Sequence, residues 1–90
     1  MAVVAVKIKA LPDSPESNIE ELKSKISDSL LKAGAIKINS IEDEPLAFGL
    51  KAIIIFFAWP EEQDTSKAED AIKVEGISSV ETIDYRRAFG

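Results

Sequence analysis

Residues 50–59, LKAIIIFFAW, form the most hydrophobic segment of the chain and are apolar at every position except Lys51. A run of this length that ends at a proline, here Pro60, predicts a strand in the middle of a sheet, covered on both faces or with one face left to a partner. Its side chains alternate between two sets, Ala52/Ile54/Phe56 and Ile53/Ile55/Phe57. From the pattern alone, either set can face the core. The other set predicts an apolar patch on the open face of the sheet.

The segment EDEPLAFGLKA, from Glu42 to Ala52, leads into this strand and is typical of neither a loop nor a strand. A loop would be polar throughout, and a strand would contain neither Pro45 nor Gly49. Pro45 stiffens the backbone, and Gly49 permits conformations that are closed to other residues or a close approach of a second backbone. Phe48 lies between them and is predicted at the tip of a strand connection. The residues alone leave it undecided whether Phe48 folds back into the core or is exposed. The acidic run 42–44 matches no cation-binding loop and predicts a solvated surface.

Toward the N-terminus, the pattern predicts a strand, a helix and a second strand. Val4, Val6, Ile8 and Ala10 alternate with other residues, which is typical of a strand with one buried face that ends at Leu11–Pro15. A helical stripe then runs to Gly34, with Asn18 or Ser14 as its N-cap. The stripe consists of Ile19, Leu22, Ile26, Leu30 and Ala33. Ile36 and Ile38 mark the second strand, with Ile41 as a further candidate, and the change of phase between Ile38 and Ile41 predicts a bulge or a bend.

Toward the C-terminus, a shorter helix and a last strand follow. Ser66-Lys67-Ala68-Glu69 fits a capping box that opens the helix, and Gly76 is its predicted end. The last strand is expected over Ile77 to Arg87, with Val80, Ile83 and Tyr85 as its main apolar residues.

The order strand, helix, strand, strand, helix, strand predicts an α+β fold. In one domain of 90 residues, it indicates a ferredoxin-like split βαβ sandwich (βαββαβ). Four antiparallel strands form its sheet and both helices cover one face. This fold serves many functions and does not by itself identify one.

Composition excludes several classes of protein. The chain has no cysteine and no histidine, so thiolate metal sites, thiol nucleophiles and Ser-His catalysis are absent. An enzyme is therefore disfavoured, and neither a metal nor a cofactor is expected. A net charge of −5 argues against direct nucleic-acid binding. The longest apolar run is far below the roughly 20 residues of a membrane span, and we expect a cytoplasmic protein.

Arg86 and Arg87 form the one concentrated positive spot of this acidic chain. Position alone favours ordinary surface residues on a terminal strand. The alternative is that their guanidinium groups meet an anionic or carboxylate-rich partner. Phe89, one residue from the end, is expected to be exposed unless a partner docks it.

Three segments of the chain resemble the elongation factor 1-beta family of translation, in its archaeal form. They are EPLAFGLKAIIIFF in the middle, KIKALPDSP near the start and GISSVETIDYRR near the end. The most distinctive piece is the set Pro45, Phe48, Gly49, Leu50 and Lys51. The resemblance implies a guanine nucleotide exchange factor for the elongation factor 1-alpha GTPase, acting without cofactor. It also implies the split βαβ fold, with Ile53, Ile55 and Phe57 toward the helices and Phe48 in contact with the GTPase.

Two features depart from the family pattern. Relatives are more polar at the positions of Ile54 and Phe56. The apolar character of the sheet face that carries these two residues therefore suggests extra partner contact or a homo-oligomer. Eukaryotic members carry a penultimate lysine that reaches toward the magnesium site of the GTPase, whereas this chain ends in RRAFG. Arg86 or Arg87 is the candidate to supply that charge. The rival interpretation is an oligomerisation or small-ligand module on the same fold, without exchange activity.

Overall fold

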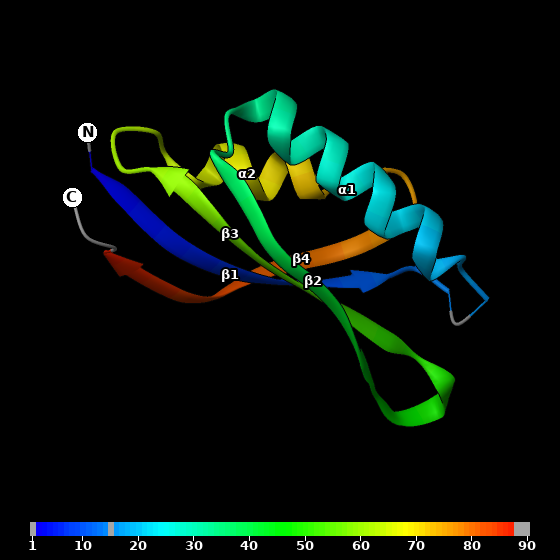
Figure 1. Ribbon diagram of the computed structural model, residues 1–90. Coiled ribbons are helices and arrows are strands. Elements are labelled where there is room, and N and C mark those ends of the chain that lie inside the picture. The colour runs from blue at the N-terminus through cyan, green and yellow to red at the C-terminus, as the bar shows by residue number, and fades with distance from the viewer. Residues whose placement is uncertain (1, 15, 88–90) are drawn as a thin grey trace.

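The computed structural model describes residues 2–14 and 16–87. Its four strands form one antiparallel sheet in the order β2-β3-β1-β4, and both helices lie on one side of it (Figure 1). The elements in chain order are β1 (Val3–Pro12), α1 (Ile19–Ala33), β2 (Lys37–Pro45), a 3-10 turn (Ala47–Gly49), β3 (Lys51–Pro60), α2 (Thr65–Ile72) and β4 (Ile77–Arg87). This confirms the predicted α+β, ferredoxin-like split βαβ architecture.

The core lies between the sheet and the helices, and the two central strands supply most of it. On β3, Ile53, Ile55 and Phe57 are fully buried, whereas Ile54 and Phe56 are only half-buried. The register places the buried β3 residues beside the buried face of β1, with Ile8 opposite Ile55 as one example. The central position of β3 is therefore as the pattern predicted, and the direction of its two side-chain sets is as the family resemblance implied.

Each edge strand carries an irregularity. The β2–β3 register shifts between Ile38 and Ser40, so of the predicted bulge or bend the bulge is observed. The β1–β4 register shifts beside Ile83, between the pairs of Lys7 and Ile8. Bulges twist edge strands away from further pairing and so discourage unwanted strand addition.

The ends of α1 follow the sequence signals. The Oδ1 atom of Asn18 accepts a hydrogen bond from the backbone N–H of Glu21 at 3.1 Å, so Asn18 is the N-cap and Ser14 is not. Gly34, with φ of 121°, ends the helix, and its N–H donates to the carbonyl of Leu30. Glu21 and Lys25 form the expected surface ion pair at 3.5 Å.

The capping box predicted for α2 is wrong. Asp64 caps the helix by accepting a hydrogen bond from the N–H of Ser66 at 2.9 Å, and Ser66 lies within the first turn. An aspartate is as good a cap as a serine, and its charge also suits the positive end of the helix dipole. The helix ends at Ile72 rather than at Gly76, which has φ of 101° in the turn that leads into β4.

The main apolar residues of β4 are only partly buried. Ile83 and Tyr85 are about half exposed, at 45% and 51%, and Val80 is only half-buried. The physical reason is position, because β4 is an edge strand, and Ile83 is the unpaired residue at its bulge, between Thr82, which faces α2, and Asp84, which pairs with the outward-facing Lys7. One contact anchors it, since the Thr82 hydroxyl donates to the Glu69 carboxylate of α2 at 2.7 Å.

Candidate functional site

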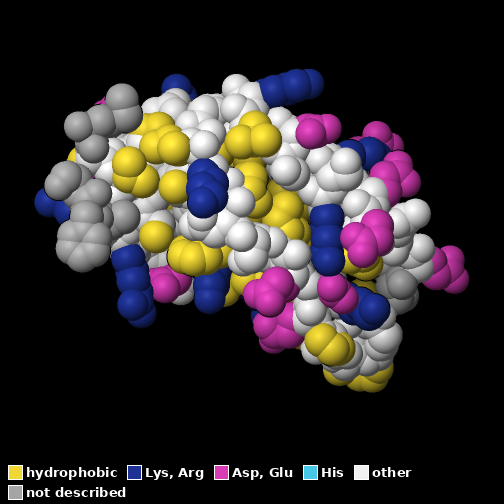
Figure 2. Space-filling view, in the orientation of Figure 1, with side chains coloured by type: hydrophobic (Ala, Val, Ile, Leu, Met, Phe, Trp, Pro, Cys, Tyr) yellow, Lys and Arg dark blue, Asp and Glu magenta, His cyan; other side chains and the backbone are white. Residues whose placement is uncertain are grey.

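The β2–β3 hairpin extends beyond the part of the sheet that the helices cover, and its tip is well separated from them (Figure 1). We call residues 45–51 the hairpin tip. The backbone closes it through two hydrogen bonds, from Leu46 N–H to the Leu50 carbonyl at 2.7 Å and from Leu50 N–H to the Ala47 carbonyl at 3.3 Å. Hydrophobic side chains cover its end and acidic side chains lie nearby (Figure 2).

Phe48 is the most exposed large hydrophobic residue at the tip, with 94% of its surface open to solvent. Its backbone is left-handed, with φ of 62° and ψ of 29°, which costs a non-glycine residue about 1–2 kcal/mol. Packing does not compensate this strain, because the ring lies outside the core. Of the two directions that the sequence left open, the outward one is therefore observed. A strained, outward aromatic ring is typical of a contact residue.

Gly49 and Pro45 shape the turn around this ring. Gly49 has φ of 76°, and a Cβ atom added there would meet nothing within 4 Å. Its role is therefore conformational freedom rather than a close approach of another backbone. Pro45 ends β2 opposite Lys51, where the ladder needs no further donor.

A set of ion pairs ties the base of the hairpin to the body of the protein. The Asp43 carboxylate accepts a hydrogen bond from the Lys23 ammonium of α1 at 3.0 Å, and its other oxygen lies 3.8 Å from Lys51 Nζ. The Lys23 side chain is only 17% exposed. Asp43 points toward the helices while Glu42 and Glu44 alternate to the other face, so the acidic run does not converge on one point. Sequence reasoning missed this link between α1, β2 and β3.

These contacts shift the ionisation of Asp43. The hydrogen bond and the charge of Lys23, with a smaller contribution from Lys51, hold the pKa of the Asp43 carboxyl below its ordinary value of 3.8. A carboxyl whose pKa is lowered by folding stabilises the fold above its unfolded pKa, and it loses this effect as the pH falls through the folded value.

We therefore expect Asp43→Asn to lower the thermal midpoint modestly at pH 7, and this difference from the parent to shrink below about pH 4. At low pH the parent carboxylate is protonated and has lost the same interaction. Thermal unfolding followed by circular dichroism from pH 7 to pH 3 measures the effect. Glu44→Gln, on the other face of β2, is the control and is expected to change little. An equal midpoint for Asp43→Asn and parent at pH 7, or a gap that stays constant down to pH 3, contradicts the prediction.

The two arginines lie at the other end of the sheet. Arg87 pairs with the Glu61 carboxylate, with Nε donating to Oε2 at 2.9 Å, and Arg86 Nε lies 3.2 Å from an oxygen of Asp84. The hydrogen bond from Arg87 lowers the pKa of Glu61, and the same contact raises the pKa of the Arg87 guanidinium. Both guanidinium groups remain more than 70% exposed, at 79% and 73%, so these pairs exchange readily with other partners. Phe89 lies outside the described residues.

The predicted site residues thus fall into two groups that the fold does not bring together. Pro45, Phe48, Gly49 and Lys51 share the hairpin tip, whereas Arg87 pairs through Val4 with Trp59 at the far end of β3. Lys51 and Trp59 are eight residues apart on that strand, which is about 27 Å at about 3.4 Å per residue. The longest dimension of the molecule is 42 Å. A partner that touches both groups has to span most of its length.

Over residues 5–87 the sequence matches a known protein family, described as the EF-1 guanine nucleotide exchange domain. The chain belongs to this family. It is 44% identical to an elongation factor 1-beta of Methanocaldococcus jannaschii over 98% of this chain and 100% of that one. It is 43% identical to that of Methanosarcina barkeri, over 97% and 99%. The corresponding protein of Saccharolobus solfataricus is 37% identical over 97% of each chain. The likeness therefore covers the whole domain, and nucleotide exchange in elongation is the function it supports.

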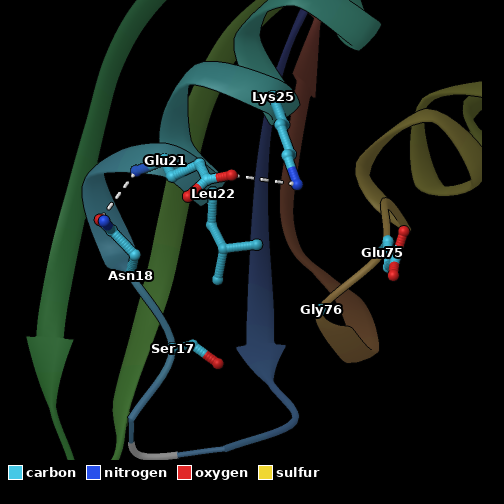
Figure 3. A pocket seen from close by; sticks show the side chains of 7 residues that line it. All are labelled: Ser17, Asn18, Glu21, Leu22, Lys25, Glu75 and Gly76. Carbon is cyan, nitrogen blue, oxygen red and sulfur yellow. Dashed lines mark hydrogen bonds and ion pairs between the residues drawn. The ribbon is translucent and has the colours of Figure 1, made fainter.

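One hollow of the described molecule lies apart from the hairpin tip and the terminal arginines. A hollow lined by Ser17, Asn18, Glu21, Leu22, Lys25, Glu75 and Gly76 lies between the start of α1 and the turn before β4 (Figure 3). The Asn18 cap and the Glu21–Lys25 pair engage three of these side chains (Figure 3), whereas no hydrogen bond or ion pair within the described residues engages the side chains of Ser17 and Glu75. In the same residue ranges, no group of three or more acidic side chains is placed to hold a metal ion. None of the described helices is long and apolar enough to cross a membrane.

Proposed function

We propose that this member of the exchange family releases GDP from the elongation factor 1-alpha GTPase during translation elongation. The observation that carries the proposal is Phe48, which is 94% exposed, held in a strained conformation and placed on a projecting hairpin. Family membership supports nucleotide exchange as the activity, and the names of the relatives point to elongation factor 1 as its setting.

Exchange requires binding rather than bond chemistry, which suits a chain without histidine or cysteine. A GTPase holds GDP through phosphate contacts and a magnesium ion. A factor that binds best to the nucleotide-free state lowers the affinity for GDP, and GDP lowers the affinity for the factor by the same amount. A coupling free energy of about 3 kcal/mol already changes the affinity by more than a hundredfold.

In this proposal the two ends of the sheet act on different parts of the GTPase. The Phe48 ring is a wedge at one end, stiffened by Pro45 and Gly49 and held in place through Lys51 and Asp43. Arg86 and Arg87 are the cations at the other end, where they compete with magnesium for the groups around it. Their exposed ion pairs with Asp84 and Glu61 cost little to exchange for new partners. The net charge of −5 favours encounter with basic surface on the GTPase.

The test is the release of fluorescent GDP from the cognate elongation factor 1-alpha, with and without this protein. We expect clear acceleration at equimolar protein, and no acceleration at that ratio contradicts the proposal. One arm of the same assay carries Arg86→Gln and Arg87→Gln together. If these arginines act on the surroundings of magnesium, the variant loses more activity at high than at low magnesium. An equal loss at all magnesium concentrations assigns them to binding alone.

A further inference from the structure

The face of the sheet opposite the helices lies apart from the hairpin tip. Figure 1 shows both helices on one side and no other described element on the second side. We call this second side the open face. Its centre is the outward row of β3, where Ile54 and Phe56 are half-buried between the strands on either side.

The strand register places acidic residues on one side of β3 and lysines on the other side across the open face. Ile54 has Glu42 of β2 on one side and Lys9 of β1 on the other. Phe56 has Ser40 on one side and Lys7 on the other, with the Lys7 ammonium 5.8 Å from the ring centre. An apolar stripe along β3 therefore separates acidic groups on β2 from lysines on β1. Within the described residues, no ion pair engages Glu42 or Lys9.

This pattern is complementary to itself. A two-fold rotation about an axis along β3 lays β3 of one copy on β3 of the other, and β2 of each copy over β1 of its neighbour. The rotation keeps every row at its own height, so Ile54 meets Ile54 of the second copy. In the same row, Glu42 faces Lys9 of the second copy, and the symmetry repeats that pair. Sheets pack face to face in this aligned way with a spacing of about 10 Å.

Other placements of the axis lose this match. If the axis lay between β3 and β1, Ile54 would meet the lysine row of the neighbour, and the acids of β2 would meet Glu81 and Asp84 on β4. Such an arrangement buries apolar groups against cations and places like charges together, which is unfavourable.

We propose that the open face is an interface between two copies of this chain, with β3 on the two-fold axis and Glu42 paired to Lys9 of the second copy. The proposal does not depend on the exchange function, because the hairpin tip and the terminal arginines lie at the ends of the sheet. Three strands over seven residues of β3 cover about 14 by 20 Å, so both copies together bury about 600 Å². Since stable interfaces bury about 1,200 Å² or more, this dimer is weak and forms at high micromolar concentration.

The first measurement is sedimentation velocity of the whole chain from about 10 μM to about 1 mM. We expect a reversible shift from monomer to dimer that weakens as salt is added, because exposed ion pairs are screened. A chain that stays monomeric throughout this range overturns the proposal.

Charge reversal then tests the pairing itself. Lys9→Glu and Glu42→Lys are each expected to weaken the dimer about tenfold, since each creates two like-charge contacts through the symmetry. The double variant restores the match in every row and is expected to associate like the parent. Lys32→Glu, on an exposed position of α1, is the matched control and is expected to have little effect.

Net charge alone predicts a different outcome. Glu42→Lys brings the protein closer to neutrality, so a nonspecific charge effect would strengthen its association. A stronger dimer for Glu42→Lys, or a double variant that remains weak, overturns the proposed geometry. Circular dichroism of each variant confirms that the fold is intact, as expected for solvent-accessible positions.

Discussion

We expect Phe48→Ala to remove most of the acceleration of GDP release while leaving the fold unchanged. Exposed aromatic residues that anchor an interface commonly contribute about 2–4 kcal/mol, so exchange at limiting protein should fall by about 30-fold to several hundredfold. Stability should change by less than about 0.5 kcal/mol, because the ring is 94% exposed and contributes no core contact. Stopped-flow release of fluorescent GDP measures the first effect, and urea unfolding measures the second.

Two control variants separate the side chain from its backbone. Phe48→Gly removes the ring and also the left-handed strain, so it should lose exchange activity while gaining about 1 kcal/mol of stability. Leu31→Ala truncates a residue of α1 that is 48% exposed and lies away from the tip, and it should keep full activity. Full exchange activity in Phe48→Ala contradicts the role of Phe48 as a wedge. It does not contradict the exchange function itself, for which the variant with Arg86→Gln and Arg87→Gln then tests the other end of the sheet.

The main lines of the fold could be read from the sequence because they depend on side-chain periodicity. The apolar run of β3 predicted a central strand, and the phase change in β2 predicted the bulge or bend that is observed as a bulge. Helix caps were less predictable, since Asp64 and Ser66 carry equally suitable side chains and only the path of the preceding turn selects Asp64. The exposure of Ile83 follows from the bulge at that position and that of Tyr85 from the edge position of β4, and no local pattern encodes either.

For the candidate site, the residue pattern identified Pro45 and Gly49 as the residues that shape the turn, but it did not identify the direction of the Phe48 side chain. Phe48 and Gly49 both have a left-handed backbone, and this turns the Phe48 ring outward. The conformation follows from the hydrogen bonds that close the hairpin rather than from the Phe48 side chain. The Lys23–Asp43 contact was missed because it joins two residues that are 20 positions apart in the chain and lie on different elements. One signal was present, since Asp43 lies two residues after the inward-facing Ile41 and so shares its face.

We expect Trp59→Ala to have the opposite profile and to destabilise the fold by about 3–5 kcal/mol. Trp59 is fully buried, packs edge-to-face on Phe57 with ring centres 5.9 Å apart, and donates its indole N–H to the Gln63 carbonyl at 3.1 Å. Removing it leaves a large cavity at the end of the core. Because small domains have only about 5–15 kcal/mol of stability, the variant should be partly unfolded at moderate temperature. Urea unfolding followed by circular dichroism measures the loss.

Trp59→Phe separates packing from hydrogen bonding, since it keeps a ring but leaves the Gln63 carbonyl without its donor, and a smaller loss of about 1–3 kcal/mol is expected. Comparison of Trp59→Ala with Phe48→Ala also discriminates between stability and function. Trp59 lies in the core, so each folded molecule of Trp59→Ala should still accelerate GDP release once cooling or a stabilising osmolyte restores the fold. Phe48→Ala should stay inactive under the same conditions. If Trp59→Ala remains inactive when folded, the Trp59 end of the sheet contributes directly to exchange, and the neighbouring Arg87–Glu61 pair becomes the first contact to examine.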